Sequence, residues 1–184
     1  NEPLSKAGST ITGGNVLGNI SDAGEGAAIV AHENVLARMP REPFRALPTD
    51  TFFTEEKDLF FNGEAVQLLH QPSAHTDGDT IVFFRRSDVV STGDIFLTTT
   101  YPVIDVAKGG SINGIVNALN RILDITIPRE KQEGGTMVIP GHGRLCDEAD
   151  VVEYRDMMTI IRDRIQDMVQ KGMSVQQVKV AQPT

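Results

Sequence analysis

The hydrophobic pattern of this chain changes its period at Gly109-Gly110. Upstream of that point, short apolar or alternating runs are separated by turn residues such as Asn62-Gly63, which is typical of strands. Downstream, apolar residues recur at helical spacing from Ile112 to Ile122 and again from Val151 to Met168, which is typical of helices that bury one face. Strands followed by covering helices predict an α/β layer architecture.

Local patterns predict the individual elements. Ser111 is placed as the N-cap of the first long helix, and the second long helix is expected to end near Gly172. A helix of one or two turns is expected over 32–39, because Pro40 follows. Glycine-rich residues 1–26 favour irregular loop, and the polar tail 173–184 has no pattern that assigns it a structure. Apolar runs predict short strands over 27–31, 51–54, 59–61, 65–69, 80–84, 89–91 and 136–139.

The charge balance limits the partners of this chain. Its 184 residues, enough for one domain with a real core, carry 25 acidic and 17 basic side chains, which gives a net charge of −8. An acidic surface repels phosphate backbones, which argues against nucleic acid as a partner. No apolar run approaches the roughly 20 residues of a membrane-spanning helix, so we expect a soluble protein without membrane insertion, cytoplasmic or periplasmic. The single cysteine, Cys146, excludes an intrachain disulfide framework.

Three metal-capable side chains lie just beyond the ends of expected strands. His75 lies in AHTDGD, Asp94 in STGD and His142 in PGHG. Strand ends bordered by glycine are places where a rigid scaffold presents ligands to a cleft. Imidazole nitrogen and carboxylate oxygen both bind Zn²⁺ at about 2.0–2.2 Å, and one carboxylate offers an oxygen to each of two ions. The order His, Asp, His therefore predicts a metal centre at which the three side chains converge.

Each candidate also has an ordinary structural interpretation. His32, which opens a short helix, and His70, at a strand end, are expected to be structural histidines of the surface or core. An aspartate after a glycine, such as Asp94, commonly caps a turn. The joint pattern at three strand ends is what favours a metal centre for His75, Asp94 and His142.

Three segments together resemble the metallo-β-lactamase fold superfamily: AHTDGDTIVFF, STGDIF and IPGHG, in this order. Each segment is weak alone, but the set is specific, and the resemblance extends over nearly the whole chain, including AAIVAHENV and the C-terminal helix. It implies an αββα sandwich with the metals between the two sheets. It also implies that His75 binds the first of two zinc ions, that Asp94 bridges both, and that His142 binds the second. Iron and manganese suit such mixed ligands as well.

The chain departs from the superfamily upstream. Members carry an HxHxDH motif with further ligands for both ions and the expected acid/base aspartate, and this chain has no histidine before His32. In the superfamily this motif commonly runs on into Gly-Gly-Asn. The asparagine of that sequence would be Asn1, just after the missing glycines, or the whole sequence would lie in Thr12-Gly13-Gly14-Asn15. In either register the HxHxDH motif lies outside this chain. We therefore expect residues 1–184 to be the C-terminal portion of one such domain, an incomplete sandwich without its N-terminal strands. Truncation or proteolysis is favoured over evolved loss.

For the intact protein, the resemblance implies hydrolysis of a small-molecule substrate by metal-activated water. Zinc β-lactamases commonly carry Cys or Ser at the position of Asp94, whereas Asp there resembles the glyoxalase II, lactonase and sulfatase branch. An ester, lactone or thioester is therefore the expected substrate class, with a β-lactam as an alternative. Tyr101 is either a substrate contact or an ordinary packed loop aromatic.

A second hypothesis is a non-catalytic half-domain that acts as an interaction or complementation partner. A fold without its N-terminal strands has an open sheet edge and an uncovered apolar face, which invite pairing with the N-terminal part or with a second copy. On either hypothesis this chain alone is expected to bind metal poorly and to be inactive, because neither ion keeps the three protein ligands typical of a catalytic zinc.

Overall fold

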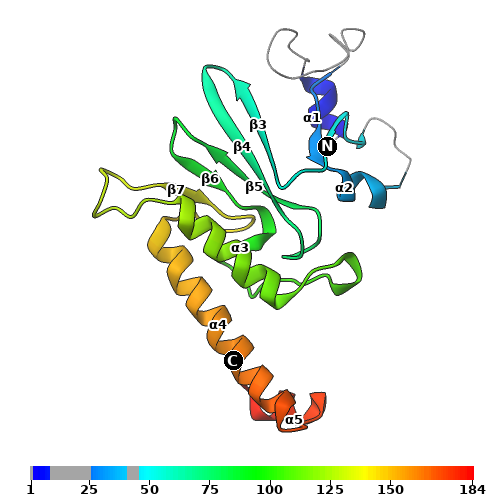
Figure 1. The fold of residues 1–184 in the computed structure, drawn as a ribbon, viewed down its shortest axis with the longest axis vertical. Helices are drawn as coiled ribbons and strands as arrows, with labels where there is room; N and C mark the ends of the chain where they lie inside the picture. Colours follow the sequence, from blue (N-terminus) through cyan, green and yellow to red (C-terminus); the bar gives the residue numbers. More distant parts are fainter. Residues whose placement is uncertain (1, 9–25, 41–45) are drawn as a thin grey trace.

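The computed structural model describes residues 2–8, 26–40 and 46–184, and its largest feature is a five-stranded sheet (Figure 1). The strand order is β3-β4-β5-β6-β7, with antiparallel neighbours from β3 to β6 and a parallel pair of β6 and β7. The strands are Glu56–Phe61 (β3), Glu64–Gln71 (β4), Asp79–Phe84 (β5), Val89–Ser91 (β6) and Met137–Ile139 (β7). The expected turn between β3 and β4 is confirmed, with Asn62 and Gly63 both at positive φ, as a two-residue hairpin requires.

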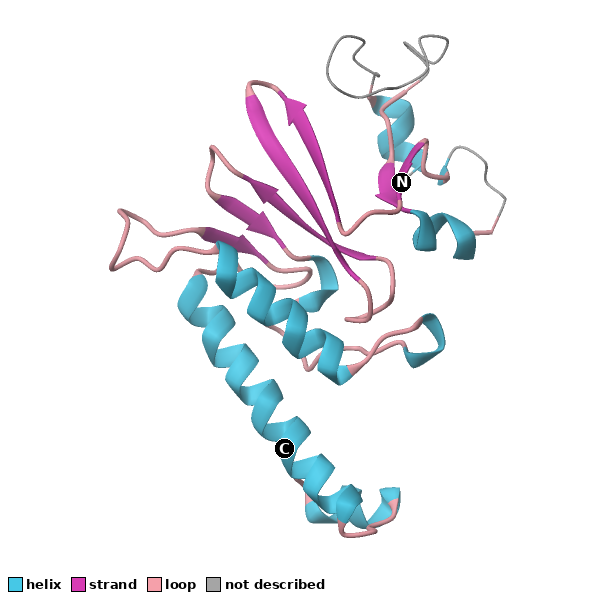
Figure 2. Cartoon of the chain, in the orientation of Figure 1, coloured by secondary structure: helices cyan, strands magenta, loops and turns pink. Residues whose placement is uncertain are grey.

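One face of this sheet is covered by α3 (Ile112–Ile125) and α4 (Glu148–Gln170), which lie side by side in Figure 2. Residues three and four apart share one side of a helix, so the apolar stripe of each helix faces the strands. The core between the two layers is made of buried side chains from both: Ile81, Val90, Val138, Ile115, Leu119, Ile122, Val151 and Met158. This arrangement confirms the α/β layer architecture.

The opposite face of the sheet carries a smaller layer. There, β1 (Val30–His32) and β2 (Asp50–Phe52) form a separate parallel pair, and α2 (Glu33–Arg38) follows β1. Phe52 packs with Val66 and Leu68, whose side chains point away from α3 because side chains alternate along β4. The strand predicted near 51–54 therefore lies outside the five-stranded sheet, since its backbone pairs with β1.

The expected helix ends are confirmed. The Ser111 hydroxyl caps α3 by accepting a hydrogen bond from the Gly114 amide at 2.9 Å. Helix α4 ends at Gln170, two residues before Gly172, whose φ of 74° is the left-handed conformation that glycine favours after a helix.

Two further helices lie where none was assigned. Residues Glu2–Ala7 form α1, so the expectation of irregular loop over 1–26 is wrong for this part, and residues 9–25 lie outside the described residues. An ion pair between Glu2 and Lys6, one helical turn apart, supports α1. Residues Val175–Ala181 of the tail form α5, which starts with a capping box between Ser174 and Gln177. This capping pattern is the sequence signal for α5.

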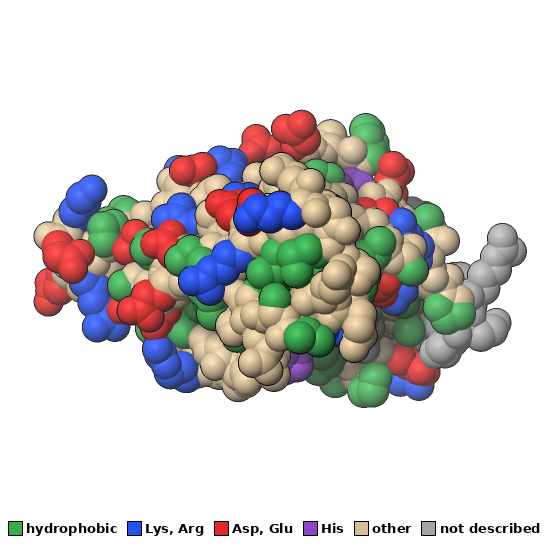
Figure 3. All heavy atoms as spheres, turned by 90° about the horizontal axis from the view of Figure 1, so that it is seen from below, with side chains coloured by type: hydrophobic (Ala, Val, Ile, Leu, Met, Phe, Trp, Pro, Cys, Tyr) green, Lys and Arg blue, Asp and Glu red, His purple; other side chains and the backbone are tan. Residues whose placement is uncertain are grey.

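The surface mixes charged and apolar side chains. In the view from below, acidic and basic side chains are interspersed, with apolar side chains between them (Figure 3). At the free edge of the sheet, Phe60 and Phe61 of β3 are each about half exposed, at 53% and 54%. Within the described ranges, no helix combines the length and apolar character needed to span a membrane.

Candidate metal centre

The sheet topology brings the three predicted metal ligands to one edge. Strands β4 and β6 are each antiparallel to β5, and β7 is parallel to β6, so β4, β6 and β7 all run in the same direction. Their carboxyl ends therefore share one edge of the sheet. His75 follows β4, Asp94 follows β6 and His142 follows β7.

Asp94 and His142 are adjacent at this edge. The Nε2 atom of His142 lies 3.4 Å from Oδ1 of Asp94, and their side chains are 67% and 40% exposed. The two strand ends are joined behind them: the amide and the hydroxyl of Thr92 both donate hydrogen bonds to the carbonyl of Ile139, at 3.0 and 3.2 Å. The fold thus holds a carboxylate and an imidazole together at a position open to solvent.

Gly141 makes this approach sterically feasible. A Cβ at this position would lie 2.3 Å from Oδ1 of Asp94 and 2.7 Å from the carbonyl oxygen of Gly93. Both distances are below any normal contact, so only glycine fits beside Asp94 without a shift of the backbone. The glycine of IPGHG is therefore part of the geometry that joins Asp94 to His142.

His75 lies at the same edge but has different neighbours. Its Nδ1 atom lies 3.6 Å from Oδ1 of Asp79, and its carbonyl accepts a hydrogen bond from the Asp105 amide at 2.9 Å. Asp79 is itself fixed by Thr76, whose amide and hydroxyl donate to its carboxylate at 2.9 Å each. In the described part of the chain, His75 forms no hydrogen bond or ion pair with Asp94 or His142. Strand β5 separates β4 from β6, which places the strand ends about 10 Å apart.

Comparison with known proteins identifies the fold that carries these residues. No family model matches the sequence, and no curated protein matches it. Among solved structures, a metallo-β-lactamase from Pontibacter korlensis matches with a TM-score of 0.53 and 16% identity over 72% of this chain. The B3 metallo-β-lactamase BLEG-1 matches with a TM-score of 0.56 and 20% identity, also over 72% of this chain. The chain has a metallo-β-lactamase fold.

The same fold extends to a different hydrolase. The inverting sec-alkylsulfatase Pisa1 from Pseudomonas sp. matches over 71% of this chain, with a TM-score of 0.56 and 12% identity. This chain spans 58% of the length of the Pontibacter korlensis protein, 66% of BLEG-1 and 21% of Pisa1. The expected αββα sandwich is confirmed as an incomplete one, in which the five-stranded sheet and its helices face the two-stranded layer.

The donor atoms at this edge of the metallo-β-lactamase fold suit zinc, but their number falls short. Asp94 and His142 offer the oxygen and nitrogen donors that Zn²⁺ binds. Over residues 2–8, 26–40 and 46–184, however, no three His, Cys, Asp or Glu side chains lie close enough together to hold a metal ion. A catalytic zinc takes three protein ligands. The described residues therefore do not by themselves form a complete metal centre.

The other histidines have structural roles, as expected. His32 is 5% exposed and caps α2, where its Nδ1 accepts a hydrogen bond from the Asn34 amide at 3.3 Å. The His70 ring stacks on that of His32 with a centroid distance of 3.6 Å, and its Nε2 lies 2.8 Å from the Asp77 carbonyl. Burial, and then the neighbouring His70, lower the pKa of His32. The pair links α2 to the segment that contains His75.

The thiol of Cys146 is buried and hydrogen-bonded. The residue is 6% exposed, and its thiol donates a hydrogen bond to the Arg144 carbonyl at 3.3 Å. Burial raises the pKa of this thiol to about 11, so it is neutral at physiological pH. Metal ions bind the thiolate form.

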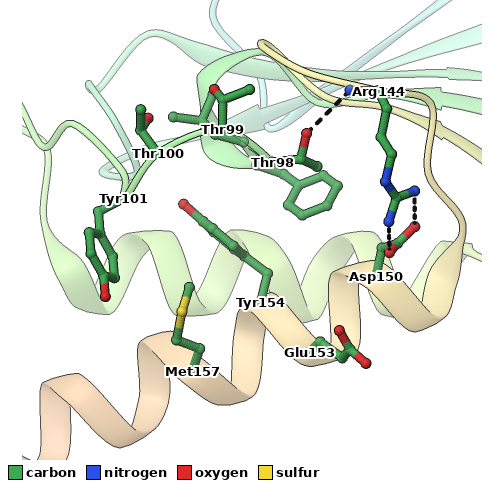
Figure 4. Close-up of a pocket in the computed structure, with 11 residues that line it drawn as sticks. Thr98, Thr99, Thr100, Tyr101, Arg144, Asp150, Glu153, Tyr154 and Met157 are labelled. Carbon is green, nitrogen blue, oxygen red and sulfur yellow. Dashed lines mark hydrogen bonds and ion pairs between the residues drawn. The ribbon is translucent and has the colours of Figure 1, made fainter. Parts of the chain in front are cut away.

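Tyr101 lies on a pocket. Its side chain is 56% exposed, so the interpretation as a packed loop aromatic is wrong. It lines a pocket of about 700 Å³ between the segment that follows Asp94 and helix α4 (Figure 4). Sequence reasoning missed the other wall, which includes Arg144, Glu153 and Tyr154. Tyr154 belongs to the apolar stripe of α4, where nothing in the pattern distinguishes it from a core residue.

Proposed function

We propose that this chain is part of a metal-dependent hydrolase whose metal centre includes Asp94 and His142, with His75 as a further ligand. The 3.4 Å approach of His142 to Asp94 is the observation that carries the proposal. It occurs in a metallo-β-lactamase fold, at the sheet edge that also holds His75. The remaining ligands come from residues outside the described ranges or from another chain.

The chain's own residues have distinct roles in this proposal. The Asp94 carboxylate and the His142 imidazole would hold metal ions at this edge of the sheet. His75 would contribute Nε2, since Asp79 faces its Nδ1. When bound, zinc lowers the pKa of a water molecule toward 7 and polarises the substrate carbonyl. Iron and manganese remain alternatives to zinc.

The proposed substrate is an ester, lactone or thioester. An aspartate at position 94, in place of Cys or Ser, favours this class over β-lactams. Hydrolysis of a β-lactam is an alternative, because BLEG-1 is a B3 metallo-β-lactamase of the same fold.

The decisive experiment starts from the gene. The coding sequence upstream of Asn1 is read for an HxHxDH motif, and the longest reading frame is expressed and loaded with zinc. We expect hydrolysis of lactone and thioester substrates that is abolished by Asp94→Asn and unchanged by Asp58→Asn, an exposed aspartate on β3. An upstream motif with no hydrolysis of esters, lactones, thioesters or β-lactams would contradict the proposal.

A non-catalytic half-domain is the second candidate function. It is favoured by apolar side chains left exposed on the sheet: Met137 and Ile139 of β7 are 45% and 36% exposed, on the face away from α3 and α4. Such a surface suits pairing with an N-terminal part or a second copy. A reading frame that starts with Met close to Asn1, together with a stable oligomer in light scattering, would favour this function over hydrolysis.

A further inference from the structure

We propose that the pocket between α4 and the segment 96–101 binds a small organic cation, with an ammonium group and a second polar group on an apolar body. The pocket has a volume of about 700 Å³. Residues 96–101 line one side of it, and Arg144 and the first turns of α4 line the other (Figure 4). This proposal does not depend on a bound metal.

Tyr154 provides the first indication of a ligand. Its side chain is 8% exposed, and its hydroxyl has no hydrogen-bond partner, the one such buried side-chain oxygen or nitrogen in the described residues. Buried hydroxyls are normally paired. In Figure 4 the hydroxyl points from α4 toward the segment that ends at Tyr101. Burial raises its pKa to about 12, so at neutral pH the group remains an O–H that both donates and accepts.

The charges around the pocket favour a cation. Its one basic side chain, Arg144, is bound by Asp150, with Nη1 2.9 Å from Oδ2 and a second contact through Nη2. Glu153 also lines the pocket, and it forms no ion pair within the described part of the chain. The uncompensated charge is therefore a carboxylate. An anionic ligand would have to displace Asp150 from Arg144, whereas a cation meets Glu153 directly.

The remaining walls suit an ammonium group on an apolar body. The rings of Tyr154 and Phe96 pack edge to face, with their centroids 5.2 Å apart. Tyr101 adds a second, exposed phenol ring to the lining of the pocket. Aromatic faces attract cations. The exposed hydroxyls of Thr99 and Thr100 and the unpaired hydroxyl of Tyr154 are available to a polar group on the same ligand.

Hydrogen bonds of Thr98 join the pocket to the loop that carries His142. The Thr98 hydroxyl accepts a hydrogen bond from the Arg144 amide at 3.2 Å and donates one to the His142 carbonyl at 3.5 Å. The cation is therefore either a separate ligand or a positively charged part of the substrate. A separate ligand and a charged part of the substrate would be bound by the same chemistry. Binding of a cation to the metal-free chain, with no substrate present, measures the affinity of the pocket alone.

The test uses a charged probe and its neutral isostere. Choline and 3,3-dimethylbutan-1-ol have the same shape, but a carbon replaces the cationic nitrogen in the second. We expect choline to shift the NMR resonances of Thr98 to Tyr101 and of the first turns of α4 saturably, with a Kd at least tenfold lower than that of the isostere. Glu153→Gln should raise the choline Kd at least fivefold without changing that of the isostere, and the exposed Glu130→Gln, a matched loss of charge, should leave both unchanged.

Tyr154→Phe tests the hydroxyl separately. Because this hydroxyl makes no hydrogen bond to the protein, the variant should fold with an unchanged or higher Tm while binding choline more weakly. Equal affinities for choline and its isostere would overturn the proposal. So would a choline Kd that Glu153→Gln leaves unchanged, or binding of acetate or sulfate at these residues in preference to choline.

Discussion

Nε2 of His142 lies 3.4 Å from Oδ1 of Asp94, across the ends of two parallel strands that are far apart in the sequence. The side chains meet because β6 and β7 pair in register, with Ser91 opposite Ile139, and because each ligand lies three residues beyond its strand. The contact is thus a consequence of strand pairing. A metal centre built on it would have two of its donors positioned in advance.

Asp94→Asn is expected to reduce the activity of the proposed hydrolase without unfolding it. An amide keeps the shape of the carboxylate but loses its charge and one oxygen donor, so a bridging ligand becomes at best a ligand to one ion. A loss of about 3 kcal/mol in metal or transition-state binding corresponds to roughly a hundredfold in rate. Steady-state kinetics and thermal unfolding check this. An unchanged rate at unchanged metal content would show that Asp94 only caps a turn.

Gly141→Ala is expected to damage the same site through the backbone. The added methyl group would lie 2.3 Å from Oδ1 of Asp94 and 2.7 Å from the Gly93 carbonyl oxygen, so the ends of β6 and β7 must separate. Overpacking of this kind costs about 1–3 kcal/mol. Urea unfolding should show this loss, and zinc affinity should fall in the same variant. Wild-type values for both would mean that the two loops do not approach as closely as described.

Gly114→Ala tests how α3 docks on the β4–β5 connection. Alanine is the better helix former by about 1 kcal/mol, which alone would stabilise the protein. Its Cβ, however, would lie 1.8 Å from the carbonyl oxygen of Ser73, so the steric term should prevail and Tm should fall. Asn117→Ala, at an exposed position of the same helix, is the control and should raise Tm slightly or leave it unchanged. A higher Tm for Gly114→Ala would refute the close approach.

The stacked pair of His32 and His70 predicts a pH-dependent stability. Burial and His70 lower the pKa of His32 in the folded state, while the unfolded chain keeps the ordinary value near 6.5. Stability from this group is therefore fully present above about pH 6.5 and is lost as the pH falls toward the lowered value, because the unfolded chain then binds more protons. His70, Glu33 and Asp77 are the ionisable groups that act on His32.

His32→Asn is the matched variant for this prediction. Asparagine keeps a side-chain oxygen that can cap α2 but does not titrate, so the unfolding free energy should depend less on pH between 7 and 5. The readout is the slope of the unfolding free energy against pH, because the loss of ring stacking lowers stability at every pH. A slope equal to that of the wild type would assign the pH dependence to other groups.

Much of the fold follows from local patterns in the sequence. The strand runs, the turn at Asn62-Gly63 and the caps at Ser111 and Gly172 are set by side-chain periodicity and backbone geometry, which are local properties. The pairing of β2 with β1 depends on contacts between distant segments, and no local pattern records it. Helix α1 was missed because the glycines that follow it dominate the composition of its region.

In the candidate site, too, some features follow from local sequence patterns and others depend on how distant segments pack. Residue types and strand ends were enough to select Asp94 and His142, and the strand directions explain why His75 reaches the same edge. The distance of His75 from the other two depends on strand order, because β5 lies between β4 and β6. The pocket at Tyr154 depends on how α4 faces the segment after Asp94, which only the packed structure reveals.

Zinc titration of the chain labelled with ¹⁵N-histidine tests the central claim most directly. The chain has only four histidines, so each imidazole can be followed separately. We expect His142 to respond first and with weak affinity, with no change at the stacked His32 and His70. Asp94→Asn should weaken the response of His142 at least tenfold, and Asp58→Asn should leave it unchanged. A His142 resonance that zinc does not move, or that moves equally in Asp94→Asn, would contradict a metal centre built on Asp94 and His142.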